Sequence, residues 1–325
     1  MSITRRVAVG GLAALPFVHG QARAQANFPN RPMTLVVPFP AGGPADIFGR
    51  NLAERMSPFL GQPVLVENKS GAAGVTGIDF VAKAATDAHV MGLMSASAGA
   101  IMQHLMPKMP FDPAKDIAPL TIIVRVQEIL AVNAKLGLND FASFVAAAKA
   151  KPGKITAGSA GSGGITHLAI ELLKREAGID LLHVPYRGAA PATNDLLAGT
   201  VDCTLLDISI TLPHARTGAV KVLAVTSDTR ALLLPDVPTM RELGLPKVNS
   251  DNWYVLISPG AVPLAERQKV HAAAVQALKS KQVIDAYAAV GGVATSSTPE
   301  ETAAFLRQEG VKWGEVVRSA NVKLE

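Results

Sequence analysis

The stretch that decides the fold is LVVPFPAGGPADIFGR, residues 35–50. Its first residues extend an apolar, β-branch-rich run that begins at Met33, and such a run next to proline predicts a buried strand. The prolines and glycines of PFPAGG (38–43) end this strand, and from Asp46 large apolar side chains recur every three or four residues, as in an amphipathic helix. A glycine-containing turn between a strand and a helix leaves backbone N–H groups free at the positive end of the helix dipole. The stretch is therefore either an ordinary β–α turn or an anion-binding one.

Small-residue turns of the same kind recur after predicted strands and before predicted helices, at residues 71–74, 95–99 and 158–164. This alternation of strand, turn and helix predicts an α/β fold with mainly parallel sheets and flanking helices. Ligands of open α/β sheets bind beyond the carboxyl ends of the strands, where such turns meet. None of the turns has the lysine of a phosphate loop or the full GxGxxG pattern, so a carboxylate is a better candidate ligand than a nucleotide.

The chain is predicted to form two domains without a flexible linker between them. Apolar runs near residues 117–133 lead out of the first domain, and the predicted strand 252–258 leads back into it. We therefore expect residues 25–125 and 251–325 to form domain 1 and residues 126–250 to form domain 2. Two crossing strands would act as the hinge.

The N-terminus predicts an export signal in residues 1–24. Arg5 and Arg6 precede the apolar run 7–18, which is too short to span a bilayer, and Ala-Arg-Ala at 22–24 is a small-x-small cleavage site. The paired arginines leave both the general and the twin-arginine export routes open. The simplest destination is the periplasm of a Gram-negative cell.

Composition excludes several classes of protein. The chain is 49% hydrophobic and 18% charged, which indicates a packed globular protein. Without residues 1–24 it has 28 basic against 26 acidic residues, so we expect no nucleic-acid partner. No later apolar run is long enough for a transmembrane helix, and Cys203, as the only cysteine, cannot form an intrachain disulfide. The histidines lack i, i+4 pairing, so no metal site is expected. We also expect no cofactor, and we expect a monomer.

Several polar residues have two interpretations. Ser162 lies in AGSGG (160–164), one glycine short of a nucleophile elbow, and aspartates and a histidine follow in the order of a serine hydrolase. An exported serine hydrolase using Ser162 is therefore an alternative function. Asp46 either caps its helix or faces the cleft, and Arg50 is placed for an i, i+4 contact with it. Tyr186 either covers the edge of the core or lines a site.

Five ordered motifs together carry a family resemblance. They are PFPAGGPADIFGR (38–50), NKSGAAGVTG (68–77), GSAGSGGITHLAIELLK (158–174), HVPYRGAAPATNDLLAGTVD (183–202) and LPDVPTMRELG (234–244). The chain resembles the extracytoplasmic solute receptors of the Bug (TctC) type, which belong to tripartite tricarboxylate transporters. This resemblance implies a two-domain periplasmic binding protein of the Venus flytrap, type II-like class. Such a receptor is not an enzyme; it closes over a small organic acid and serves the membrane subunits of the transporter.

The resemblance also implies which residues bind the ligand. In domain 1 they are Phe39, Ala41, Gly42, Gly43 and Asp46 in the first turn, and Ser95 and Ser97 on the wall; in domain 2 they are Ser159, Ala160, Gly161, Ser162, Gly163, Thr166, Tyr186 and Asp207. Ala45 departs from the family, which often has a hydroxyl residue there, so only a backbone contact is expected at this position. The identity of the carboxylate stays open, as does a role as the ligand-presenting partner of a membrane sensor.

Overall fold

The computed structural model describes residues 28–320, 322 and 324 and contains two β-sheets. Six strands form the first sheet, in the order β11-β4-β10-β3-β1-β2. Their bounds are β1 (Met33–Val37), β2 (Val64–Asn68), β3 (Val90–Ser95), β4 (Ile117–Val126), β10 (Asn252–Pro259) and β11 (Gly292–Ala294). We call the part of the molecule built on this sheet lobe 1.

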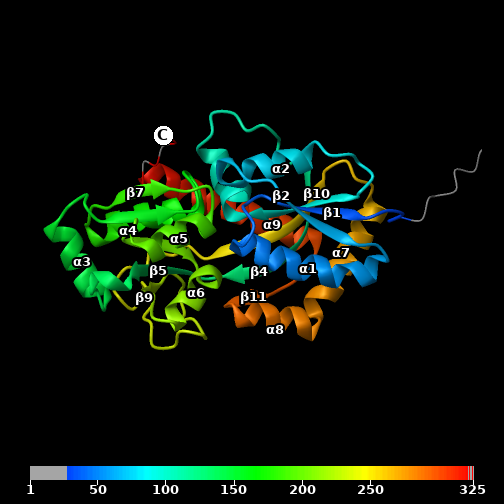
Figure 1. Ribbon diagram of the computed structural model, residues 1–325. Helices are drawn as coiled ribbons and strands as arrows, with labels where there is room; N and C mark the ends of the chain where they lie inside the picture. Colours follow the sequence, from blue (N-terminus) through cyan, green and yellow to red (C-terminus); the bar gives the residue numbers. More distant parts are fainter. Residues whose placement is uncertain (1–27, 321, 323, 325) are drawn as a thin grey trace, which may run out of the picture.

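Five strands form the second sheet, in the order β7-β6-β8-β5-β9. Their bounds are β5 (Glu128–Asn133), β6 (Thr156–Ser159), β7 (Leu182–Pro185), β8 (Cys203–Asp207) and β9 (Val220–Val225). We call this part lobe 2, and Figure 1 shows it in green beside lobe 1. The chain passes from β4 directly into β5 and returns to lobe 1 at β10, so the two predicted crossing strands are present.

The two-domain α/β fold is confirmed, but both sheets are mixed, so the expectation of mainly parallel sheets is wrong. β1 is parallel to β2 and β3, and β6 is parallel to β7 and β8, as predicted for βαβ units. By contrast, β10 is antiparallel to β3 and β4, and β5 is antiparallel to β8 and β9. The crossing strands cause this difference. β5 and β10 enter their lobes from the cleft, whereas β8 and β3 end at the cleft, so each crossing strand runs antiparallel to its neighbour.

Helices pack beside both sheets (Figure 1). Those of lobe 1 are α1 (Pro44–Leu60), α2 (Val75–Ala82), α7 (Leu264–Lys279) and α8 (Lys281–Ala289), with the short turns η1 (Ala72–Gly74), η2 (Ser97–Ile101) and η3 (Met102–His104). Those of lobe 2 are α3 (Phe141–Ala150), α4 (Ile165–Ala177), α5 (Ala189–Ala198) and α6 (Ile208–Arg216), with the short turn η4 (Ala134–Leu136). Local signals fix their ends: α1 and α4 stop at Gly61 (φ 69°) and Gly178 (φ 61°), where glycine takes the left-handed conformation without strain.

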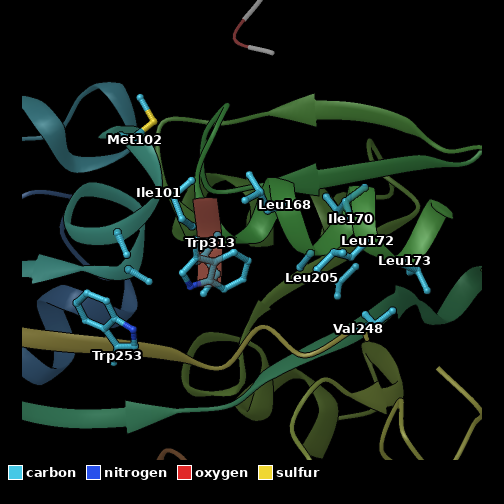
Figure 2. Close-up of a cluster of buried hydrophobic side chains, with 14 of the residues drawn as sticks. Ile101, Met102, Leu168, Ile170, Leu172, Leu173, Leu205, Val248, Trp253 and Trp313 are labelled. Carbon is cyan, nitrogen blue, oxygen red and sulfur yellow. The ribbon is translucent and has the colours of Figure 1, made fainter. Parts of the chain in front are cut away.

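The last helix, α9 (Pro299–Ala320), joins the two lobes behind the sheets. Its Trp313 is fully buried in one apolar cluster with Ile101 of lobe 1 and Leu168 of lobe 2. Figure 2 shows Trp313, Ile101 and Leu168 in this cluster. The indole nitrogens of Trp313 and Trp253 both donate to Glu309 Oε2, at 3.1 and 2.8 Å. No helix among the described residues is long and apolar enough to cross a membrane.

We expect Trp313→Ala to lower the free energy of unfolding by about 3–5 kcal/mol, because it leaves a large cavity in the shared core. Urea unfolding measures this difference. Val311→Ala is the matched control on the same helix: its side chain is 64% exposed, so its loss should change stability by less than about 0.5 kcal/mol. Equal effects of the two substitutions would contradict a core that runs through both lobes.

Candidate functional site

The amino ends of helices from both lobes surround one small cavity of about 30 Å³. Gly43–Ala45 at the start of α1 belongs to lobe 1, and Gly164–Thr166 at the start of α4 belongs to lobe 2. Ala189 begins α5, and Asp207 precedes the first residue of α6. We call this space the inner cavity. The other lining residues are Phe39, Pro40, Ser95, Ser97, Ala160, Leu206, Asn252 and Tyr254.

The side chain of Asp46 stabilises the turn before α1 through hydrogen bonds. Asp46 Oδ2 accepts hydrogen bonds from Gly42 N and Arg50 Nε, both at 2.9 Å, and Oδ1 accepts one from Asn68 Nδ2 at 2.9 Å. Burial raises the pKa of this carboxyl, but the bonds from Arg50, Gly42 and Asn68 outweigh burial, and the pKa lies below its usual value. The N-cap of α1 is Gly43 without a side-chain cap, so the interpretation of Asp46 as the helix cap is wrong. Asp46 shapes the turn and is not among the residues lining the cavity.

The turn before α4 contacts lobe 1 across the cleft. Ser97 Oγ accepts a hydrogen bond from Ile165 N at 3.1 Å, which joins the two lobes. Within the turn, Thr166 Oγ1 accepts from Ala160 N at 2.9 Å. These bonds satisfy two backbone donors of a glycine-rich segment, and the helix start faces the cavity.

Two stacked histidines form hydrogen bonds with the turn before α4. The rings of His167 and His183 lie parallel, with centroids 3.8 Å apart. His167 Nδ1 accepts from Gly163 N at 3.0 Å, and His183 Nε2 lies 2.6 Å from Ser159 Oγ. Burial lowers the pKa of both histidines to about 4, so both are neutral at pH 7. Ser159 is fully buried in this network.

A buried polar network closes the base of the inner cavity. Asp207 Oδ2 accepts from Tyr254 Oη at 2.8 Å, and Asn252 Nδ2 donates to Asp207 Oδ1 at 3.0 Å. Burial raises the pKa of Asp207 to about 6. Asn252 and Tyr254 belong to β10, so this network also joins the lobes. Sequence reasoning missed both residues; the only signal was two polar side chains at the start of an otherwise apolar strand.

Two more carboxyls lie beside the crossing strands. Glu128 faces Asp207 in the β5–β8 register, and its Oε2 accepts from Ser250 Oγ at 2.7 Å. Burial raises the pKa of Glu128 well above its usual range, and the neighbouring Asp207 raises it further. Asp251 has a pKa raised to about 7 by burial. Of these three carboxyls, only Asp207 is among the residues lining the inner cavity.

A second, larger cavity of about 480 Å³ adjoins the first, and we call it the outer cavity. Phe39 and Ala160 line both cavities. The other lining residues are Ser70, Gly71, Ala72, Ala73, Gly74, Gly161, Ser162, Pro185, Tyr186 and Arg187. The Tyr186 hydroxyl donates to Asp195 Oδ2 at 2.6 Å, and burial followed by this bond raises its pKa to about 12. Tyr186 both packs on the core and lines the cavity, so its two interpretations are compatible.

The predicted binding residues divide into three groups. Phe39, Gly43, Ser95, Ser97, Ala160, Thr166 and Asp207 line the inner cavity, and Phe39, Ala160, Gly161, Ser162 and Tyr186 line the outer one. Ala41, Gly42, Asp46, Ser159 and Gly163 are not among the residues lining either cavity. Ala41 and Gly42 are exposed on the outer side of their turn, and the other three are buried beneath the turns.

The inner cavity suits an anion through its backbone. Its described lining contains no lysine, arginine or histidine. Each helix start directs the positive end of its helix dipole, about half a positive charge, toward the cavity. Ser95 Oγ is buried without a hydrogen-bond partner among the described residues, and it lines the cavity as a further donor. No group of three potential metal ligands occurs in the described part of the chain.

Two lobes joined by crossing strands, with such a cavity between them, define a two-domain binding protein. The model for the tripartite tricarboxylate transporter family receptor matches residues 48–322. The chain is 35% identical to the protein BugT of Bordetella pertussis (strain Tohama I) over 326 residues, covering 100% of both chains.

Solved structures agree with this match. An R. palustris protein solved with adipate is similar with a TM-score of 0.88 and 28% identity, over 91% of this chain and 99% of that one. MatC from Rhodopseudomonas palustris, solved with bound malate, is similar with a TM-score of 0.85 and 30% identity, over 89% and 100%. The chain belongs to the TctC (Bug) family of extracytoplasmic solute receptors. It is a periplasmic-type binding protein and not an enzyme, so the serine-hydrolase alternative is dropped.

Asp207→Asn should stabilise the protein more at pH 7 than at pH 4. The pKa of Asp207 is about 6 in the folded protein and near 3.9 in the unfolded chain. Its contribution to stability therefore falls as pH rises from about 4 to 6, while the asparagine does not titrate. We expect the difference in the free energy of unfolding between the variant and the wild type to increase by about 2 kcal/mol from pH 4 to pH 7.

Urea unfolding of both proteins at the two pH values measures this gap. The two stacked histidines are common to both proteins, and Asp207 does not contribute to their pKa shifts, so their titrations cancel in the comparison. A gap that stays constant with pH would mean that Asp207 has an ordinary pKa.

Proposed function

We propose that this protein captures a small carboxylate-bearing metabolite in the cleft between its lobes and presents it to the membrane subunits of a tripartite transporter. The single observation that carries this proposal is the meeting of four helix starts, from both lobes, around a cavity whose described lining has no basic side chain. Such a site holds an anion by main-chain donors and helix dipoles.

The ligand class proposed here is a dicarboxylate. Two relatives of known structure support it, because one was solved with adipate and the other with malate. Backbone donors recognise a carboxylate group, whereas the rest of the cavity decides which molecule carries it.

Closure of the cleft is part of the proposal. We propose that residues 25–125 with 251–325 move as one unit and residues 126–250 as the other, with the crossing strands as the hinge. The hydrogen bond from Ile165 N to Ser97 Oγ supports a closed arrangement in this structure, because it spans the cleft. A ligand held by both lobes would favour this arrangement over an open one.

The proposed site of action is the periplasm, with the protein acting as a monomer. The predicted signal peptide, residues 1–24, lies outside the described residues. Its charged start, apolar middle and cleavage motif support export.

Thr166→Asp should abolish ligand binding while leaving the fold intact. Thr166 is the second residue of α4 and lines the inner cavity, so an aspartate there supplies a resident carboxylate that repels an added one. An acidic residue at a helix start is itself favourable, so the helix should persist. Thr166→Asn is the matched control, because it has the same shape without the charge.

The measurement is the ligand-induced rise in melting temperature with malate, succinate and adipate, using protein unfolded and refolded to remove bound metabolites. At a hundredfold excess over Kd, binding stabilises the folded state by about 2.7 kcal/mol. We expect a shift for wild type and Thr166→Asn, and none for Thr166→Asp. The absence of any shift in the wild type with all three acids would overturn the proposed function.

A further inference from the structure

A third cavity lies outside the cleft, between lobe 1 and the last helix, and we call it the α9 cavity. It measures about 690 Å³ and shares no lining residue with the inner or the outer cavity. Its walls include α9, the turns η2 and η3, and the segment 113–119 at the start of β4. Sites for one small molecule commonly measure roughly 300–1,000 Å³, so the α9 cavity has the size of a ligand site.

Apolar side chains form much of the wall of the α9 cavity. They are contributed by Met94, Ile117, Pro119, Leu306 and Val311, and the Val311 side chain is 64% exposed. The flexible methionine can adapt to apolar groups of different shape. A hydrocarbon chain in this cavity would remove both its own surface and that of the wall from water, which favours binding.

Two arginines give the same cavity a positive charge. Arg307 and Arg318 line it from one face of α9, about three helical turns apart, and no acidic residue is among its described lining. The helix positions three or four residues from Arg307 hold only alanine, glycine and valine. Neither arginine takes part in the ion pairs or side-chain hydrogen bonds found in the described part of the chain. Both guanidinium groups can therefore bind an anion.

Close packing of η3 on α9 fixes one side of this cavity. His104 Nε2 donates to Gly310 O at 2.7 Å, and a Cβ built on Gly314 would lie 2.8 Å from His104 Cε1. The two glycines thus allow η3 to lie directly against the helix. A wall that is already in place reduces the entropy that a ligand must lose on binding.

We propose that the α9 cavity binds a medium-chain monocarboxylate, with its carboxylate at the arginines and its hydrocarbon chain along the apolar wall. This inference does not depend on what the cleft binds. A protein partner fits the cavity less well, because a stable interface needs roughly 800 Å² of surface on each partner rather than one concave site. The combination of an apolar wall and unpaired guanidinium groups matches an amphiphilic acid in both of its parts.

The experiment measures the binding of octanoate by calorimetry on refolded, ligand-free protein. We expect one octanoate per chain in the wild type. Thr166→Asp should bind it equally well, because Thr166 lines the inner cavity and not the α9 cavity. The double variant Arg307→Gln, Arg318→Gln should weaken octanoate binding at least tenfold, because charge-assisted hydrogen bonds are lost. It should bind 1-octanol, which has the same chain without the charge, as the wild type does.

The matched control is the double variant Arg216→Gln, Lys279→Gln. It removes the same charge from two exposed positions that line none of the three cavities, so it should bind octanoate as the wild type does. No octanoate binding by the wild type, equal binding by the two double variants, or loss of binding in Thr166→Asp would each overturn the proposed site.

Sedimentation of the wild type and the Arg307→Gln, Arg318→Gln variant tests a second copy of the chain as the occupant. We expect both proteins to be monomeric. A wild-type dimer that dissociates in the variant would assign the α9 cavity to a second copy and overturn the ligand site. The proposed function is tested separately by the acids that bind in the cleft, so failure of one proposal leaves the other standing.

Discussion

The backbone amide of Ile165 sets a constraint that the whole cleft must meet. It is buried at the start of α4, and its partner is the hydroxyl of Ser97 in the other lobe, 3.1 Å away. A buried amide without a partner costs about 1–3 kcal/mol, so the two walls of the cleft are held face to face. Gly164 allows this approach, because a Cβ there would lie 3.1 Å from Ser97 Oγ. The closed cleft therefore uses the same kind of main-chain donor that a carboxylate ligand would use.

A second link between the lobes uses carboxyl groups without a direct ion pair. Asp207 is held by neutral donors of β10, and Glu128 beside it is fully buried with one oxygen unpartnered among the described residues. Burying two ionised carboxylates together is costly, so burial and the neighbouring Asp207 raise the pKa of Glu128 well above its usual range, while Asp207 has a pKa of about 6. The base of the inner cavity is thus polar, with at most one negative charge, and the helix starts supply the positive field that an anion needs.

Local patterns in the sequence are enough to predict α1, α4 and the meeting of the glycine turns, because carboxyl ends of parallel strands share one edge of a sheet. Asn252 and Tyr254 could not be found in this way. They reach the cavity because β10 pairs between β3 and β4, and that pairing is decided by tertiary contacts far apart in the chain. The hydrogen bonds of Asp46 could not be predicted from the sequence either. They depend on the backbone of Gly42, which at φ 78° directs its N–H toward the Asp46 carboxylate.

The apolar cluster around Trp313 limits how the cleft can open. It contains side chains of both lobes and of α9, and exposing it costs about 25 cal/mol for each Å² of apolar surface. The turns at 71–74 and 158–164, in contrast, meet through small residues beside the outer cavity. The least costly rotation therefore leaves the cluster and the crossing strands in place and separates these turns. These turns line the outer cavity, so their separation would widen the outer cavity first.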